Sequence, residues 1–154
     1  MRFVKMLALA LAALLLGAPV VRAQDVTLSV AISLKDAIEE LGRGFTAAHP
    51  GVTLRYNFGA SGDLQKQIEA GAPVDVFLSA AQRQMDELEK QGLIVAATRR
   101  AFARNLLSVV KPADSRLDIV KAADLVDAPV GKIAVGNPRS VPAGQYAEES
   151  LRKL

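Results

Sequence analysis

The strongest constraint on the fold is a regular alternation of short apolar runs, rich in β-branched residues, with longer amphipathic runs. Residues 26–32 read VTLSVAI, which suits a buried strand, and residues 33–51 place apolar side chains at helical spacing. The succession recurs with strand-like runs at 52–58 and 74–80 and helix-like runs at 61–70 and 82–92. Strands that alternate with crossover helices form a mostly parallel sheet covered on both faces, so the sequence predicts an α/β fold.

The second half of the chain continues the pattern less regularly. Strands are expected at 105–111 and 131–138, a short helix at 121–126 and a final helix over 143–154. A connecting segment within 79–105 separates the two series of strands and helices, which indicates a change of domain.

A change of domain in this segment predicts one α/β unit before it and another after it. The chain stops inside the amphipathic run QYAEESLRKL, so either it ends on a helix or it belongs to a longer protein.

Residues 1–23 have the organisation of a secretory signal peptide. MRFVK is a short basic start, an uninterrupted apolar run follows, and VRA places small side chains at both positions that determine cleavage. A membrane anchor is the alternative, but the apolar run is short for a spanning helix of about 20 residues. We expect cleavage after Ala23 and a soluble mature chain in the periplasm.

Removal of this segment changes the charge of the chain. Three of the 19 basic residues and none of the 16 acidic residues lie in it, so the formal net charge falls from +3 to 0. A neutral chain is not expected to bind nucleic acid or an anionic membrane surface. The sequence contains no cysteine, so neither a disulfide framework nor a cysteine-linked lipid anchor is expected.

Three predicted junctions between a strand and a helix carry small or glycine-rich residues. They read AISL at 31–34, GASGDL at 59–64 and VPAGQYA at 141–147. In open α/β sheets, ligands bind beyond the carboxyl ends of the strands, where helix starts present unpaired N–H groups and partial positive charge. The three junctions together therefore favour a pocket for an anion, built from neutral donors.

Each junction also has a purely structural explanation. Ser33 and Ser61 are expected helix N-caps, and such a cap is worth about 1 kcal/mol. For Ser33, Asp36 at the capping-box position strengthens this interpretation. Glycine on both sides of Ser61 is more than a cap requires, whereas the Pro and Gly of VPAG are common in turns.

Enzymatic functions find little support in the sequence. A serine nucleophile needs a base, and the single histidine, His49, precedes Pro-Gly at a predicted helix end. No group of histidine and carboxylate residues has metal-ligand spacing, and GASGDL lacks the Gly-Lys-Ser/Thr of a phosphate-binding loop. A small exported hydrolase that uses Ser33 or Ser61 is kept as an alternative.

Three blocks of the sequence resemble the periplasmic molybdate-binding proteins (ModA type) of ABC importers. They read AISLKDAIEELGRGFTAAHPGV, YNFGASGDLQKQIEAGAPVDVFLSA and IAVGNPRSVPAGQYAEESL. The blocks occur in the family's order and spacing, and the likeness covers essentially the whole mature chain. Ile32 replaces the second alanine of the family's usual Ala-Ala-Ser-Leu, which concerns local packing and not the serine.

The resemblance implies a non-enzymatic binding protein whose two α/β domains close on one oxyanion, molybdate or tungstate. The partners that it implies are an ABC permease and its ATPase, with no cofactor and a monomeric state. Carried over by motif, Ser33 and Ser61 would bind the oxyanion through hydroxyl and backbone N–H, and Ala143 through its N–H alone. The same residues would meet the metal only through molybdate oxygens.

The family's remaining ligands are a backbone N–H and a tyrosine hydroxyl further along the chain. Tyr146 does not match that tyrosine, because it lies inside the AGQYA run. The resemblance therefore implies an N-terminal fragment with two incomplete α/β domains. Residues 24–80 would be the N-terminal part of the first domain, and residues 81–154 a part of the second.

Neutral donors suit a desolvated dianion, because hydrogen bonds to charged groups are worth about 1.5–3 kcal/mol each. Donors alone also disfavour an oxyanion that carries a proton. Asp63 complicates this prediction, since its carboxylate could accept a proton from phosphate. A sulfate- or phosphate-binding relative is therefore the alternative, unless Asp63 is simply a first-turn carboxylate that favours the helix dipole.

Overall fold

A computed structural model of the protein describes residues 24–127 and 129–154. The predicted signal peptide over 1–23 lies outside these residues. Within residues 24–127 and 129–154, the structure contains no helix with the length and hydropathy of a membrane span.

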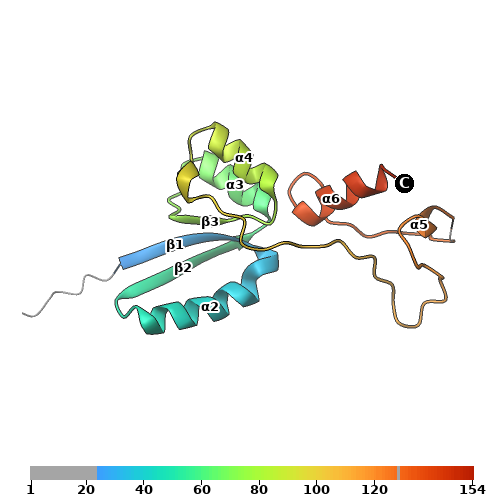
Figure 1. The fold of residues 1–154 in the computed structure, drawn as a ribbon, viewed down its shortest axis with the longest axis horizontal. Coiled ribbons are helices and arrows are strands. Elements are labelled where there is room, and N and C mark those ends of the chain that lie inside the picture. The colour runs from blue at the N-terminus through green and yellow to red at the C-terminus, as the bar shows by residue number, and fades with distance from the viewer. Residues whose placement is uncertain (1–23, 128) are drawn as a thin grey trace, which may run out of the picture.

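Three parallel strands form the sheet of the described residues (Figure 1). They are β1 (Gln24–Ala31), β2 (Val52–Gly59) and β3 (Val76–Leu78), in the order β2-β1-β3. The central strand β1 pairs along its whole length with β2, from Gln24 opposite Val52 to Ala31 opposite Gly59. The predicted α/β fold with a parallel sheet is therefore confirmed.

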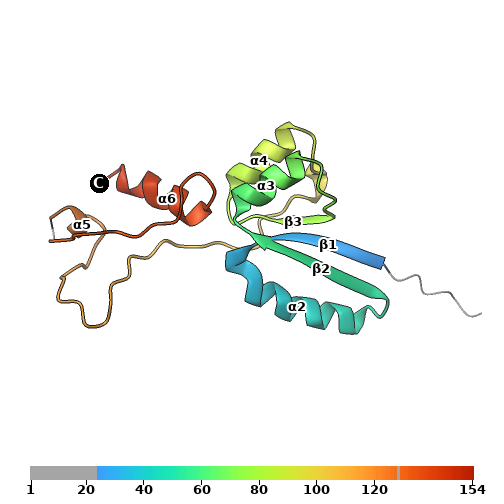
Figure 2. The same cartoon turned by 180° about the vertical axis from the view of Figure 1, so that it is seen from behind.

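The helices cover the sheet on both faces, as Figures 1 and 2 show. Helix α2 (Lys35–Ala48) lies on one face, while α3 (Ser61–Glu69) and α4 (Gln82–Lys90) lie together on the other. Since α2 joins β1 to β2 and α3 crosses over to β3, the two crossovers leave the sheet on opposite faces, as right-handed connections require for this strand order.

Two predicted helix ends have the expected glycine geometry. Gly71 and Gly92 have φ angles of 87° and 68°, and each follows the C-terminal end of its helix, α3 and α4 respectively. The first helix ends at Ala48 with His49 as its C-cap, also as predicted. The ring of His49 lies 4.3 Å from that of Phe45, measured between centroids.

The core is small and lies between the sheet and the pair α3 and α4. Its fully buried side chains are Val30 of β1, Leu64 of α3 and Leu88 of α4. On the opposite face, the apolar stripe of α2 is only partly covered, with Leu41 68% and Phe45 45% exposed. The face that carries α3 and α4 is thus the better packed.

Helix α2 contacts the sheet through a glycine. Gly42 is buried against Tyr56 of β2, and a Cβ at position 42 would lie 1.8 Å from the Tyr56 hydroxyl oxygen and 3.1 Å from Cδ1 of Leu54. The Tyr56 ring stacks on Phe58 with the centroids 5.5 Å apart, which hinders its movement. The glycine is therefore required for close packing of α2.

We expect Gly42→Ala to lower the free energy of unfolding by about 1–3 kcal/mol, because the added methyl overpacks this contact. Gly44→Ala is the matched control, since a Cβ there meets nothing within 4 Å in the same helix. Removing a helical glycine at an open site should raise stability by about 0.5–1 kcal/mol. Urea unfolding of both variants measures the difference, and equal effects at the two positions would contradict this account of α2 packing.

Two predicted strands do not form. Residues 105–111 and 131–138 have no strand structure and pair with no neighbouring strand in the described ranges 24–127 and 129–154. Leu106 and Val110, which would have been strand residues, are each 89% exposed. A β-branched run becomes a strand only beside a hydrogen-bonding partner, so the prediction for both segments is wrong in this structure.

The remaining helices agree with the sequence more closely. The short helix expected over 121–126 is observed as α5 (Asp124–Asp127), and the final helix as α6 (Pro142–Leu151). Two single 3₁₀ turns, η1 (Ile32–Leu34) and η2 (Ala96–Thr98), were not predicted.

The division into two domains stays a prediction. Helix α4, which was placed in the second domain, packs against α3 on the face of the first sheet. After η2 the chain leaves this sheet as an extended segment (Figure 1), and the turn before α6 comes back into contact with the start of α3.

Candidate functional site

The carboxyl ends of the three strands meet at one edge of the sheet. Ser33 follows β1, Ser61 follows β2 and Ser79 follows β3. The connection after β1 runs to α2 on one face of the sheet, and the connection after β2 runs to α3 on the other face. Such a switch point opens a crevice at the carboxyl ends of the strands, which is where ligands bind in sheets of this kind.

Ser33 is exposed at this edge and does not cap a helix. It lies in the 3₁₀ turn η1, and the N-cap of α2 is Leu34, with no side-chain cap hydrogen bond. The prediction of Ser33 as N-cap is therefore wrong, because the chain makes an extra turn between the strand and the helix. No hydrogen bond of the described residues uses the Ser33 hydroxyl.

Ser61 is also not a cap. The N-cap of α3 is Ala60, whose backbone is extended, and Ser61 is the first residue of the helix. The serine is fully buried, and its Oγ accepts a hydrogen bond from the N–H of Ala80 at 3.0 Å. A hydroxyl whose oxygen is already an acceptor keeps its proton for donation, which is the state required for binding an anion.

Ala80, whose N–H donates to Ser61, lies in a tight turn after β3. Ser79 Oγ donates to the carbonyl oxygen of Ala81 at 2.8 Å and accepts from the N–H of Ala81 at 3.2 Å. These bonds fix the segment that presents the Ala80 N–H to Ser61. Ser79 was not predicted as a site residue, although it lies near the end of the strand-like run VDVFLSA, beside the expected ligand-binding edge.

Ala143 is exposed in the first turn of α6, directly after Pro142 at position N1. The turn before this helix is closed by the N–H groups of Ser140 and Val141, which both donate to the carbonyl oxygen of Asn137. In the described part of the chain, the N–H groups of Ser61 and Ala143 have no hydrogen-bond partner. Two helix starts thus present free donors at this edge.

The start of α3 touches the turn that precedes α6. Gly62 N–H donates to the carbonyl oxygen of Ser140 at 3.1 Å, and a Cβ on Gly62 would lie 3.0 Å from Cα of Ser140. Gly59 instead faces a side chain of its own segment, with 3.2 Å from a Cβ at position 59 to Cδ2 of Leu64. Of these two glycines, Gly62 is therefore the one that lets another segment of the backbone approach.

One open cavity of about 760 Å³ brings the three predicted site residues together. It is lined by Ser33, Ser61 and Ala143, and also by Tyr146 of α6. The three junctions that carry these residues therefore border one cavity. Tyr146 lies inside α6, as expected, and the residue is 37% exposed.

The cavity is not lined by neutral residues alone. Arg99, Arg100 and Arg104 of the segment after η2 form part of its wall, which corrects the expectation of a pocket without cations. Sequence reasoning missed them because nothing in their spacing relates them to the junctions that bear the serines.

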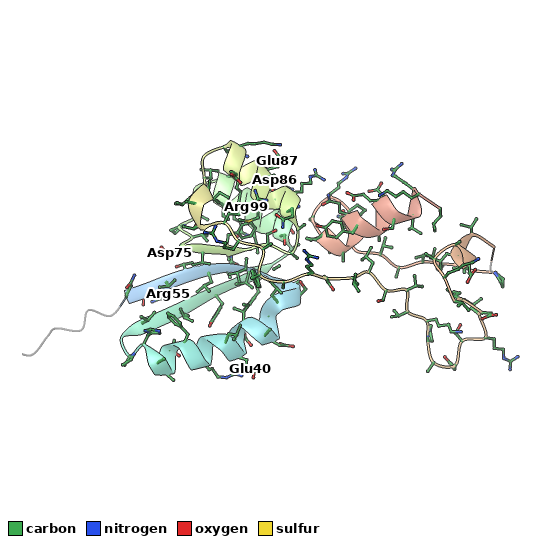
Figure 3. All side chains as sticks on the ribbon, viewed as in Figure 1. Glu40, Arg55, Asp75, Asp86, Glu87 and Arg99 are labelled. Carbon is green, nitrogen blue, oxygen red and sulfur yellow. The ribbon has the colours of Figure 1, made fainter. Side chains whose placement is uncertain are left out.

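Arg99 is held by acidic partners on α4 (Figure 3). Its guanidinium donates to Glu89 and Asp86 at 2.5 Å each and to the side-chain oxygen of Gln82 at 2.7 Å. The hydrogen bond to Glu89 and then that to Asp86 raise the pKa of Arg99 above its ordinary value. This arginine therefore fixes the start of the segment against α4, with its charge compensated.

Asp63 lies away from the cavity. Its side chain is exposed in the first turn of α3 and is not among the residues that line the cavity. Within residues 24–127 and 129–154, no group of three or more His, Asp or Glu side chains could hold a metal ion. The site thus consists of hydroxyl and backbone donors with arginines at the wall.

Comparison with known proteins gives consistent matches. The model of the bacterial extracellular solute-binding protein family matches residues 26–154. The molybdate-binding protein ModA of Haemophilus influenzae is 35% identical over 142 residues, which cover 90% of this chain and 56% of that protein. The ModA protein of Escherichia coli is 38% identical over 137 residues, covering 84% of this chain and 51% of the relative.

A solved structure agrees with these relatives. The substrate-binding domain assigned to a molybdenum ABC transporter of Clostridium difficile is 40% identical with a TM-score of 0.61, over 84% of this chain and 58% of that one. The chain spans about half the length of the curated relatives that it matches.

Proposed function

Since the chain belongs to the bacterial extracellular solute-binding protein family, we propose that the protein captures molybdate or tungstate outside the cytoplasm for an ABC importer. The observation that carries this proposal is the cavity lined jointly by Ser33, Ser61 and Ala143. The names of the matched relatives support the choice of oxyanion.

The donors suit a dianion without a proton. Ser61 would donate its hydroxyl and N–H, Ser33 likewise, and Ala143 its N–H, so that the anion receives charge-assisted hydrogen bonds. Arg99 is paired with the carboxylates of Asp86 and Glu89, so its own charge in the cavity wall is compensated. Hydrogen bonds from a fixed framework then select the ligand by size and by the absence of a proton.

The partners and the cellular location that we propose for this protein are those typical of the family. Solute-binding proteins of ABC importers deliver their ligand to a permease and its ATPase, and we propose the same for this protein as a monomer. A signal peptide over 1–23, cleaved after Ala23, would place the protein in the periplasm. Two domains, with the change near residue 80, would close on the oxyanion.

The alternatives are less well supported. A sulfate- or phosphate-binding role relied on Asp63 as proton acceptor, and Asp63 is exposed outside the cavity lining. A hydrolase that uses Ser33 or Ser61 disagrees with a family whose members are non-enzymatic components of transporters. A serine-reactive phosphonate should accordingly leave both serines unlabelled, as mass spectrometry would show.

The decisive test is a thermal-shift series on the full product of the gene that encodes this chain. We expect molybdate and tungstate to raise the melting temperature, because a ligand at one hundred times its dissociation constant stabilises the native state by about 2.7 kcal/mol. Sulfate and phosphate should leave it unchanged. A shift with either of these and none with molybdate would contradict the proposal.

A further inference from the structure

We propose that Gly62 sets the spacing between the N–H donors of α3 and those of α6, and thereby the fit of the site to its oxyanion. The inference rests on the proposed function and adds a positioning residue that acts through its contact with Ser140. Its basis is the contact between the Gly62 backbone and the turn before α6.

Gly62 lies between the two donor groups. It directly follows Ser61, whose N–H and hydroxyl open the helix α3, and its own N–H is bonded to Ser140. Ser140 precedes Ala143 by only three residues. A displacement of Ser140 relative to α3 would therefore change the separation of the two free N–H groups.

The turn before α6 moves with its helix because it is tightly bonded to itself and packed on α6. Arg139 N–H donates to Oδ1 of Asn137 at 2.9 Å, and Gln145 N–H donates to the carbonyl oxygen of Val141 at 3.1 Å. A Cβ on Gly144 would lie only 2.1 Å from the carbonyl oxygen of Gly136. The turn and the start of α6 thus act as one body in contact with Gly62.

The absence of a side chain at position 62 is what permits the contact. A Cβ there would meet Cα and the carbonyl oxygen of Ser140 at 3.0 and 3.1 Å and the carbonyl oxygen of Arg139 at 3.3 Å, so the neighbouring backbone would have to move by a few tenths of an ångström. N–H···O distances in good hydrogen bonds span only about 2.7–3.2 Å. A shift of this size would lengthen the hydrogen bonds from α3 or from α6 to an ion held between them, and so weaken its binding.

The test is calorimetric titration of the full gene product and its Gly62→Ala and Gly62→Val variants with sodium molybdate. We expect molybdate affinity to fall by about tenfold in the alanine variant and further in the valine variant. The free energy of unfolding of Gly62→Ala should change little, because the crowding against Ser140 opposes the gain from replacing a helical glycine. Gly44→Ala is the control, because its added Cβ meets open space, and its affinity should not change.

The outcomes distinguish the proposed oxyanion-binding function from the spacing role of Gly62. No molybdate binding by the unchanged protein would overturn the proposed function and the spacing role with it. Binding by the unchanged protein, with Gly62→Ala within about twofold of it, would overturn the spacing role alone. If the variants do not fold, amide exchange of the unchanged protein decides the matter, because the Gly62 amide should be protected and rapid exchange would contradict the proposal.

Discussion

Ser61→Ala should weaken molybdate binding by about tenfold to a hundredfold, since a hydrogen bond to a charged group is worth about 1.5–3 kcal/mol. The substitution removes the hydroxyl donor and also the acceptor for the Ala80 N–H, which lies 3.0 Å from Ser61 Oγ. Because Ala80 is half-buried, its unpartnered N–H should cost about 1 kcal/mol of stability as well. Titration calorimetry and urea unfolding measure the two effects.

Ser33→Ala is the matched comparison. The Ser33 side chain is exposed and caps no helix, so its loss should change stability by no more than about 0.5 kcal/mol. We expect its effect on molybdate affinity to resemble that of Ser61→Ala. Unchanged affinity in both variants would mean that Ser61 only supports the turn after β3 and that Ser33 has no role in binding.

The fold of the first half was predictable because local pattern and tertiary context agree there. The β-branched runs that became β1 and β2 each have a partner strand, and Gly71 and Gly92 end their helices with positive φ. The segments 105–111 and 131–138 have the same β-branched character and form no strand, since pairing depends on residues that a local pattern does not specify.

The surroundings of the candidate site were predictable only in part. Glycine on both sides of Ser61 signalled more than a cap, and the structure puts another backbone against Gly62. The role of Ser33 as a cap was wrong because sequence does not reveal the extra 3₁₀ turn before α2. Arg99 was missed since its partners Asp86 and Glu89 lie on a different element and no periodic spacing connects them.

Leu64→Ala is expected to have the largest effect on stability, a loss of about 2–5 kcal/mol in the free energy of unfolding. Leu64 is fully buried between α3 and the sheet. Alanine would leave a cavity in a small core, where few other side chains can move to fill it. Urea unfolding followed by circular dichroism gives the free energy of unfolding.

Leu106→Ala provides the control, because the same atoms are removed from a side chain that is 89% exposed, and the change should stay within about 0.5 kcal/mol. Leu64 also lies against Gly59, with 3.2 Å between Leu64 Cδ2 and a Cβ at position 59, so it supports the turn that places Ser61. We therefore expect molybdate affinity to fall in folded Leu64→Ala protein. If Leu64→Ala cost no more than Leu106→Ala, the core would not lie between α3 and the sheet, and the position of Ser61 would need another explanation.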